Sequence, residues 1–142
     1  MKSAIMLAAA VLILVSCASC VGRGRDNPEA EKPAIAAADQ WLALIDAEDY
    51  AQSWEEAAPY FQKNVSEEEW AQQAGGAREP LGAVESREVR NSAYHASMPG
   101  APDGEYVIIQ YQTTFENKDS AVETVTPMKV DGEWRVSGYY VK

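Results

Sequence analysis

Hydrophobic residues recur at intervals of three and four positions in the segment from 34 to 46. The stripe consists of Ile35, Ala38, Trp41, Leu42 and Ile45. At 3.6 residues per turn these positions share one face of an α-helix, and the acidic residues Asp39 and Asp46 lie off that face. The pattern therefore predicts an amphipathic first helix that buries its aromatic and aliphatic stripe.

Two shorter helices are expected before residue 77. Tyr50 and Trp54 are four positions apart, which puts them on one helix face, and Pro59 is expected to end this second helix. The stretch Ser66–Glu69 has the sequence of a capping box, in which a serine and a glutamate three positions later satisfy free amides at a helix start. The pair Gly75–Gly76 is the expected end of the third helix.

The hydrophobic period changes to two in the second half of the chain. Apolar and polar residues alternate over 107–116, which predicts a strand with one buried face. Strands are also expected over 122–130 and 133–141, and the dipeptide Asp131-Gly132 between them is typical of a tight hairpin turn. Segment 84–98 is the first strand, and its apolar residues change phase midway, which indicates a bulge.

Helices followed by a four-stranded meander define an α+β fold. We expect the N-terminal helices to pack on a curved, mainly antiparallel four-stranded sheet, so that the sheet and the first helix form a cone. Residues 34–142 have the length of a single domain. The preceding segment, 17–33, is rich in charged residues, glycine and proline, as expected of a flexible tether.

Residues 1–16 have the layout of a bacterial lipoprotein signal peptide. Lys2 gives a positive start, an apolar run follows, and small residues precede Cys17. The run is shorter than the roughly 20 residues that a transmembrane helix needs. We therefore expect cleavage before Cys17 and acylation of that cysteine, with Cys20 as the alternative. This places the protein in the bacterial cell envelope, facing the periplasm, and Ala18 in place of an aspartate favours the outer membrane.

Charge and cysteine usage exclude several function classes. The chain carries 12 basic and 22 acidic residues, a net charge of −10 at pH 7, so we expect no nucleic-acid partner. The same charge is repelled by anionic lipids, which leaves the acyl chains as the membrane attachment. Both cysteines precede residue 21, so the domain has no disulfide, cysteine nucleophile or cysteine metal site. We expect no metal and no cofactor.

Two features resemble catalytic or metal sites. His95 is the one histidine of the chain and the one candidate catalytic residue, although a histidine near a strand end needs no function. The run Glu67–Glu69 looks like a cation site, but acidic residues in the first turn of a helix are favoured by the helix dipole and the capping box. We expect the run to be structural.

Aromatic residues are abundant for a domain of this size. If the sheet curves around the first helix, some of them line a concave pocket with hydroxyl donors, as in many small-molecule sites. The candidates are Trp41, Tyr50, Trp54, Tyr111, Trp134 and Tyr140, and Trp134, Val136 and Tyr140 are expected on one face of the last strand. The alternative is that these rings simply pack the core.

Several short motifs resemble the bacterial domain-of-unknown-function family 4019. They cover essentially all of residues 34–142: WLALID (41–46), DY (49–50), SW (53–54), EW (69–70), Arg78 with PLG (80–82), PG (99–100), PDGEY (102–106), ETV (123–125) and GEWRVSGYY (132–140). The resemblance implies a fold like that of nuclear transport factor 2, a cone of three helices on a curved sheet. Isomerases and dehydratases on that cone use an acid or histidine in the pocket, but the resemblance assigns no catalytic residue to this chain.

Three functional interpretations follow. The first is a non-catalytic envelope lipoprotein that binds a small apolar ligand or an envelope protein. The second is a small pocket enzyme of the isomerase, dehydratase or hydrolase type that uses His95 or a buried acid. The third is an assembly module that forms a homodimer through a sheet face carrying Tyr106, Ile108 and Gln110.

Overall fold

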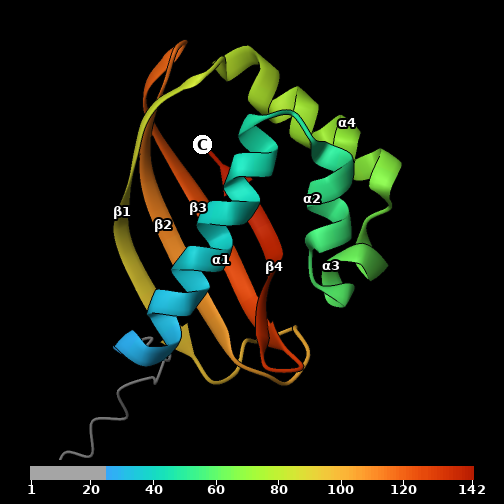
Figure 1. Ribbon diagram of the computed structural model, residues 1–142, viewed down its shortest axis with the longest axis vertical. Helices are drawn as coiled ribbons and strands as arrows, with labels where there is room; N and C mark the ends of the chain where they lie inside the picture. Colours follow the sequence, from blue (N-terminus) through green and yellow to red (C-terminus); the bar gives the residue numbers. More distant parts are fainter. Residues whose placement is uncertain (1–24) are drawn as a thin grey trace, which may run out of the picture.

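The computed structural model describes residues 25–142, and the predicted signal peptide with Cys17 and Cys20 lies outside them (Figure 1). The helices are α1 (Pro28–Asp46), α2 (Tyr50–Glu56), α3 (Pro59–Asn64), α4 (Glu67–Arg78) and a 3₁₀ turn, η1 (Glu79–Leu81). The strands are β1 (Val84–His95), β2 (Tyr106–Phe115), β3 (Lys118–Val130) and β4 (Glu133–Val141).

The four strands form one antiparallel meander in the order β1-β2-β3-β4. Helix α1 lies along one face of the sheet and contacts all four strands, while α2, α3 and α4 gather beyond it on the side of β4 (Figure 1). The predicted α+β class, with helices packed on an antiparallel four-stranded sheet, is confirmed. Within residues 25–142, no helix is both long enough and apolar enough to cross a bilayer.

Helix α1 begins before residue 34, where the sequence predicted the end of a tether. Arg25 exchanges two backbone hydrogen bonds with Tyr94 of β1, and α1 starts at Pro28. Asn27 caps the helix by accepting from the amide of Ala30, and a proline is well tolerated in the first helical turn. The tether prediction failed here because charged residues and prolines are as typical of a helix start as of a linker.

The glycine pair does not end the third predicted helix. Helix α4 continues through Gly75 to Arg78, and buried side chains on one face, Trp70, Ala74 and Arg78, hold it against the core. This packing outweighs the roughly 1 kcal/mol that a helical glycine costs. The capping box of Ser66 and Glu69 is present as predicted.

Proline 59 starts a helix as well as ending one. Helix α2 stops at Glu56, and Pro59 is the first residue of the short helix α3, which the sequence analysis did not predict. Proline suits the first turn because its missing amide has no partner there. Helix α3 buries Phe61 and contacts β4.

All three strand pairs contain register shifts, and two of these shifts bear on the predicted strands. The pairing of β1 with β2 shifts between Val89 and Asn91, which confirms the predicted phase change. The pairing of β3 with β4 shifts between Val125 and Pro127, so that Ser137 and Gly138 together lie opposite the single residue Thr126. This second bulge was not predicted.

The second bulge changes which aromatic ring of β4 faces inward. Val136 is buried and Tyr139 packs against the core, whereas Tyr140 is 62% exposed. The prediction that Tyr140 shares a face with Val136 is therefore wrong, because the extra residue inverts the alternation of the strand. The other hairpin feature, the Asp131-Gly132 turn, has positive φ at both residues, as predicted for a tight hairpin turn.

Aromatic rings from α1, α4 and β4 pack together in the core. Trp41 and Trp70 have centroids 5.8 Å apart, and Tyr139 lies 5.5 Å from Trp41. Both indoles donate to Ser53, Trp41 to its carbonyl oxygen and Trp70 to its hydroxyl. Satisfied N–H groups allow these large rings to be buried without cost from an unpaired donor.

Candidate functional site

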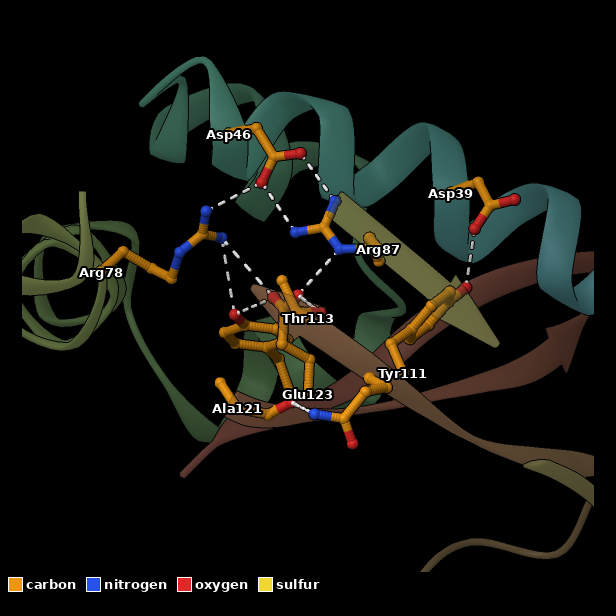
Figure 2. Close-up of polar contacts among 10 residues, drawn as sticks. Asp39, Asp46, Arg78, Arg87, Tyr111, Thr113, Ala121 and Glu123 are labelled. Atoms are coloured by element: carbon orange, nitrogen blue, oxygen red, sulfur yellow. Dashed lines mark hydrogen bonds and ion pairs between the residues drawn. The ribbon is translucent and has the colours of Figure 1, made fainter. Parts of the chain in front are cut away.

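A charged cluster joins the C-terminal end of α1 to the sheet (Figure 2). Its centre is Glu123 of β3, whose side chain has no exposed surface. One carboxylate oxygen of Glu123 accepts from Nε of Arg87 and from the hydroxyl of Thr113, both at 2.7 Å. The other oxygen accepts from the hydroxyl of Tyr139. Both oxygens of this buried carboxylate are therefore satisfied.

Asp46, the last residue of α1, forms the second acidic end of the cluster. It accepts two hydrogen bonds from the terminal nitrogens of Arg87, at 2.7 and 2.9 Å, and one at 2.8 Å from Arg78. Arg78 also lies 3.7 Å from Glu123, and its guanidinium lies over the ring of Phe115. Two arginines thus bridge two carboxylates, so the cluster has no net charge.

Burial and the neighbouring charges shift the pKa values of Asp46, Arg87 and Tyr139. Burial raises the pKa of the Asp46 carboxyl, but the hydrogen bonds from Arg87 and Arg78 outweigh this and hold it below 3.8. Burial lowers the pKa of Arg87, but its bonds to Asp46 and Glu123 raise it overall. Burial and the nearby Glu123 raise the pKa of the Tyr139 hydroxyl. The arginines stay charged and the tyrosine stays protonated at any physiological pH.

A polar pocket lies beside this cluster, and we call it the Arg78 pocket. It has a volume of about 210 Å³ and is built by the end of α1, the turn into α2, the end of α4 and the segment before β1. Its lining residues are Ile45, Asp46, Glu48, Tyr50, Arg78, Glu79, Gly82 and Ala83.

Two side chains that line this pocket each have a buried polar atom with no hydrogen-bond partner. These atoms are the hydroxyl of Tyr50 and Nε of Arg78, and they are the two such side-chain atoms in the described residues 25–142. The Arg78 side chain is only 5% exposed, and leaving a buried donor unpaired costs about 1–3 kcal/mol. Burial, with the charges of Glu48 and Glu79, raises the pKa of the Tyr50 hydroxyl, so it remains a donor. Unpaired donors on two side chains of one pocket are an unmet hydrogen-bonding demand that an acceptor from outside the chain would satisfy.

A larger groove lies at the other end of the sheet. It has a volume of about 570 Å³ and a mainly apolar lining: Pro59, Tyr60, Lys63, Asn64, Pro102, Met128, Lys129, Val130 and Asp131. None of the unpaired buried atoms in residues 25–142 belongs to it. The groove therefore has room for a ligand but no buried polar group that lacks a partner, and the Arg78 pocket is the stronger candidate site.

The six predicted pocket residues do not share one cavity. Trp41 and Tyr111 are buried in the core, and the hydroxyl of Tyr111 donates to Asp39 at 2.8 Å (Figure 2). Trp54 packs against the core and donates to the carbonyl of Val65, Trp134 lines separate surface pockets, and Tyr140 is exposed. Only Tyr50 lies in the Arg78 pocket.

The other candidate side chains are placed away from the charged cluster. His95 is the last residue of β1, is half-buried, and lies opposite Tyr106, whereas the cluster lies toward the start of that strand. The glutamates 67–69 occupy the first turn of α4 and are exposed. Within residues 25–142, no group of acidic or histidine side chains is arranged to hold a metal ion.

The sequence analysis missed Arg78, Arg87 and Glu123. A usable signal was present for two of them, because both occupy inward positions of their strands. Arg87 lies opposite Thr113, and Glu123 lies opposite Tyr111. A charged residue on a buried strand face needs a partner, and the two have opposite sign. Arg78 carried no such signal, because its burial depends on the unpredicted last turn of α4.

Comparison with known proteins gives a family and no activity. A family profile described as "Protein of unknown function (DUF4019)" matches residues 37–139. This range contains the whole charged cluster and all residues of the Arg78 pocket. The search of curated proteins gave no match.

Proposed function

The chain belongs to the DUF4019 family of proteins of unknown function, and we propose that it is a non-catalytic lipoprotein that binds a small polar molecule in the Arg78 pocket. The observation that carries the proposal is the pair of unpaired buried donors, Tyr50 hydroxyl and Arg78 Nε. The sequence favoured an apolar ligand, but the lining of this pocket, with four charged side chains, suits a polar one.

The charged cluster supports binding because it prepares the site. Arg78 is held by Asp46 on one side and by Glu123 and Phe115 on the other, so its unpaired Nε has a fixed direction. A preorganised donor avoids the entropy cost of ordering a flexible arginine when the ligand arrives. The contacts that hold the charged cluster together therefore also orient Arg78 in the neighbouring pocket.

We further propose that the domain works in the bacterial envelope, attached by acyl chains on Cys17 and facing the periplasm. The support is the arrangement of residues 1–17 together with the net charge of −10, which disfavours direct contact with anionic lipids. The packing of α1 across the sheet is also consistent with the cone of the nuclear-transport-factor-2-like fold, which we propose for this domain.

The two alternatives have less support. A pocket enzyme using a buried acid would need a carboxylate free to move a proton, and both oxygens of Glu123 already accept hydrogen bonds. For a sheet-mediated homodimer, Tyr106 is not available at the surface, because it is buried and donates to the carbonyl of Pro102 in the β1–β2 loop. Ile108 and Gln110 remain half-buried on the outer face.

A fragment screen by nuclear magnetic resonance tests the binding function. The intact chain in detergent micelles is titrated with a library of small polar molecules, a method that detects Kd values of about 1 mM, or −4 kcal/mol. We expect hits that shift the backbone amides of Glu48, Tyr50 and Glu79. Tyr50→Phe should lose these hits, and Tyr140→Phe, which changes an exposed ring outside the pocket, should keep them. Equal binding by Tyr50→Phe would contradict the proposal.

A further inference from the structure

The unpaired atoms of the Arg78 pocket define one end of its ligand. A protonated guanidinium has no acceptor, so Nε of Arg78 can only donate, and the Tyr50 hydroxyl can donate as well. The group that satisfies them must therefore be an acceptor, such as a hydroxyl, ether or carbonyl oxygen.

The charges of the pocket exclude a simple anion site. Arg78 is the one basic residue of the lining, and it is neutralised by Asp46 at 2.8 Å and by Glu123 at 3.7 Å. Glu48 and Glu79 also line the pocket, and within residues 25–142 neither side chain has an ion-pair partner. The pocket therefore has net negative charge, which repels a carboxylate or phosphate and attracts a cation.

Both acidic side chains line the same pocket as Tyr50, and one of them, Glu79, lies near the Tyr50 ring. Glu79 and the Tyr50 ring flank Gly75, where a Cβ atom would lie 3.5 Å from the glutamate oxygen and 3.7 Å from the ring. Both Glu48 and Glu79 raise the pKa of the Tyr50 hydroxyl by their charge, after the larger effect of burial. An acceptor bound to Tyr50 would thus lie in a pocket that also carries the negative charges of Glu48 and Glu79.

Glu48 has an unfavourable backbone for its residue type. It follows the end of α1 with φ of 60°, a left-handed conformation at a position where helices usually carry glycine. A glutamate here strains the backbone, and its carboxylate has no intramolecular ion pair within the described residues. A ligand contact would account for the side chain at this position.

We propose that the Arg78 pocket selects a small cation that also carries a hydrogen-bond-accepting oxygen, in the manner of an amino sugar or amino alcohol. The oxygen accepts from Tyr50 and Arg78, and the ammonium group lies between Glu48 and Glu79. The volume of about 210 Å³ equals that of roughly seven water molecules at ~30 Å³ each, which suits a molecule of monosaccharide size. This inference rests on the proposed binding function and adds the charge and class of the ligand.

Three sugars of matched size and different charge test the selection. The intact chain in detergent is titrated with glucosamine, glucose and glucuronate by isothermal calorimetry, at a pH below the pKa of the glucosamine amine. We expect glucosamine to bind about five- to tenfold more tightly than glucose, the gain that two partly solvated carboxylates provide. Glucuronate should bind more weakly than glucose. Added salt should reduce the preference for glucosamine.

Matched variants separate this inference from the proposed function. Glu79→Gln should reduce glucosamine binding a few-fold and leave glucose binding unchanged, whereas Glu88→Gln, which removes a charge from the exposed part of β1, should change neither. Tyr50→Phe should weaken both sugars.

Three results overturn the proposal in different ways. If the sugars bind with equal affinity, or glucuronate binds best, and Tyr50→Phe still weakens them, the cation class is wrong and the binding function stands. If no sugar binds while the fragment screen still gives hits that Tyr50→Phe abolishes, the class is again wrong and the binding function stands. If neither sugars nor fragments bind, or if Tyr50→Phe binds them as well as Tyr140→Phe does, both the class and the binding function are contradicted.

Discussion

The Nε–H of Arg87 donates to Oε1 of Glu123 across 2.7 Å, and the other two nitrogens of the same guanidinium bond to Asp46. One arginine on β1 therefore ties the end of α1 to β3 through a carboxylate that has no exposed surface. Because the partner is fully buried, the bond cannot be replaced by water when it is lost. The stability of the fold and the geometry of the Arg78 pocket depend on the same side chain.

Replacement of Arg87 by methionine should be strongly destabilising. The substitution leaves Arg78 as the one positive charge beside the two carboxylates of Glu123 and Asp46. Removing one partner of a buried ion pair costs about 3–5 kcal/mol of stability. Urea unfolding followed by tryptophan fluorescence measures the loss. Arg90→Met, at an exposed position of the same strand, is the control and should change the free energy of unfolding by no more than about 0.5 kcal/mol. Similar values for the two variants would show that the cluster does not stabilise the fold.

Two tyrosine-to-phenylalanine substitutions should have opposite effects. Tyr139→Phe removes the hydroxyl that donates to Glu123 and should cost about 1–3 kcal/mol of stability, because a buried carboxylate oxygen then lacks its hydrogen-bond donor. Tyr50→Phe removes a hydroxyl that has no partner, so it should be neutral or stabilising. Thermal unfolding of both variants in the absence of ligand provides the comparison. A clear loss of stability in Tyr50→Phe would mean that its hydroxyl has a structural role.

Asp46 should make the stability of the protein sensitive to acid. Its pKa in the fold lies below the ordinary value of 3.8, because the bonds from Arg87 and Arg78 outweigh burial. A lowered pKa gives stability that is complete above the unfolded value and is lost as the pH falls through the folded value. The wild type should therefore lose stability below about pH 4 more steeply than Asp46→Asn does. Asp119→Asn, at an exposed position, should keep the wild-type slope.

Local sequence patterns were sufficient for most of the fold. The stripe that includes Trp41 and Leu42 is buried, the capping box at Ser66 forms, and the Asp131-Gly132 turn joins two antiparallel strands. Each of these features is encoded within a few residues. Family membership also followed from short motifs, and the family profile confirms it.

The site was not predictable in the same way, because it depends on registers and helix ends. The one-residue bulge opposite Thr126 turns Tyr139 toward Glu123 and Tyr140 to the surface, and a strict alternation gives the reverse. Gly138 is part of this bulge and Pro127 lies next to it, and a proline within a central strand is the signal that could have located it. To predict the burial of Arg78, one would have had to place Gly75 and Gly76 inside the helix, against the low helix propensity of glycine.

Glu48→Gly should stabilise the fold and weaken the binding of the proposed ligand. Glycine adopts the left-handed backbone of this position without the steric cost of a side chain, a gain partly offset by its greater freedom in the unfolded state. The net gain should be up to about 1 kcal/mol, measured by urea unfolding. In the same variant glucosamine should bind a few-fold more weakly. If Glu48→Gly is destabilising, the side chain has structural contacts and its role in the pocket needs another explanation.

Acylation at Cys17 should be the attachment to the membrane. A chain with net charge −10 gains nothing from anionic headgroups, so acyl chains have to supply the affinity. Bacteria expressing the intact chain and grown with labelled palmitate should incorporate the label into the wild type and into Cys20→Ala, but not into Cys17→Ala. The comparison of the two cysteine variants separates the favoured site from the alternative one. Label in Cys17→Ala would overturn the assignment of Cys17 in favour of Cys20, and absence of label from the wild type would leave the envelope location without support.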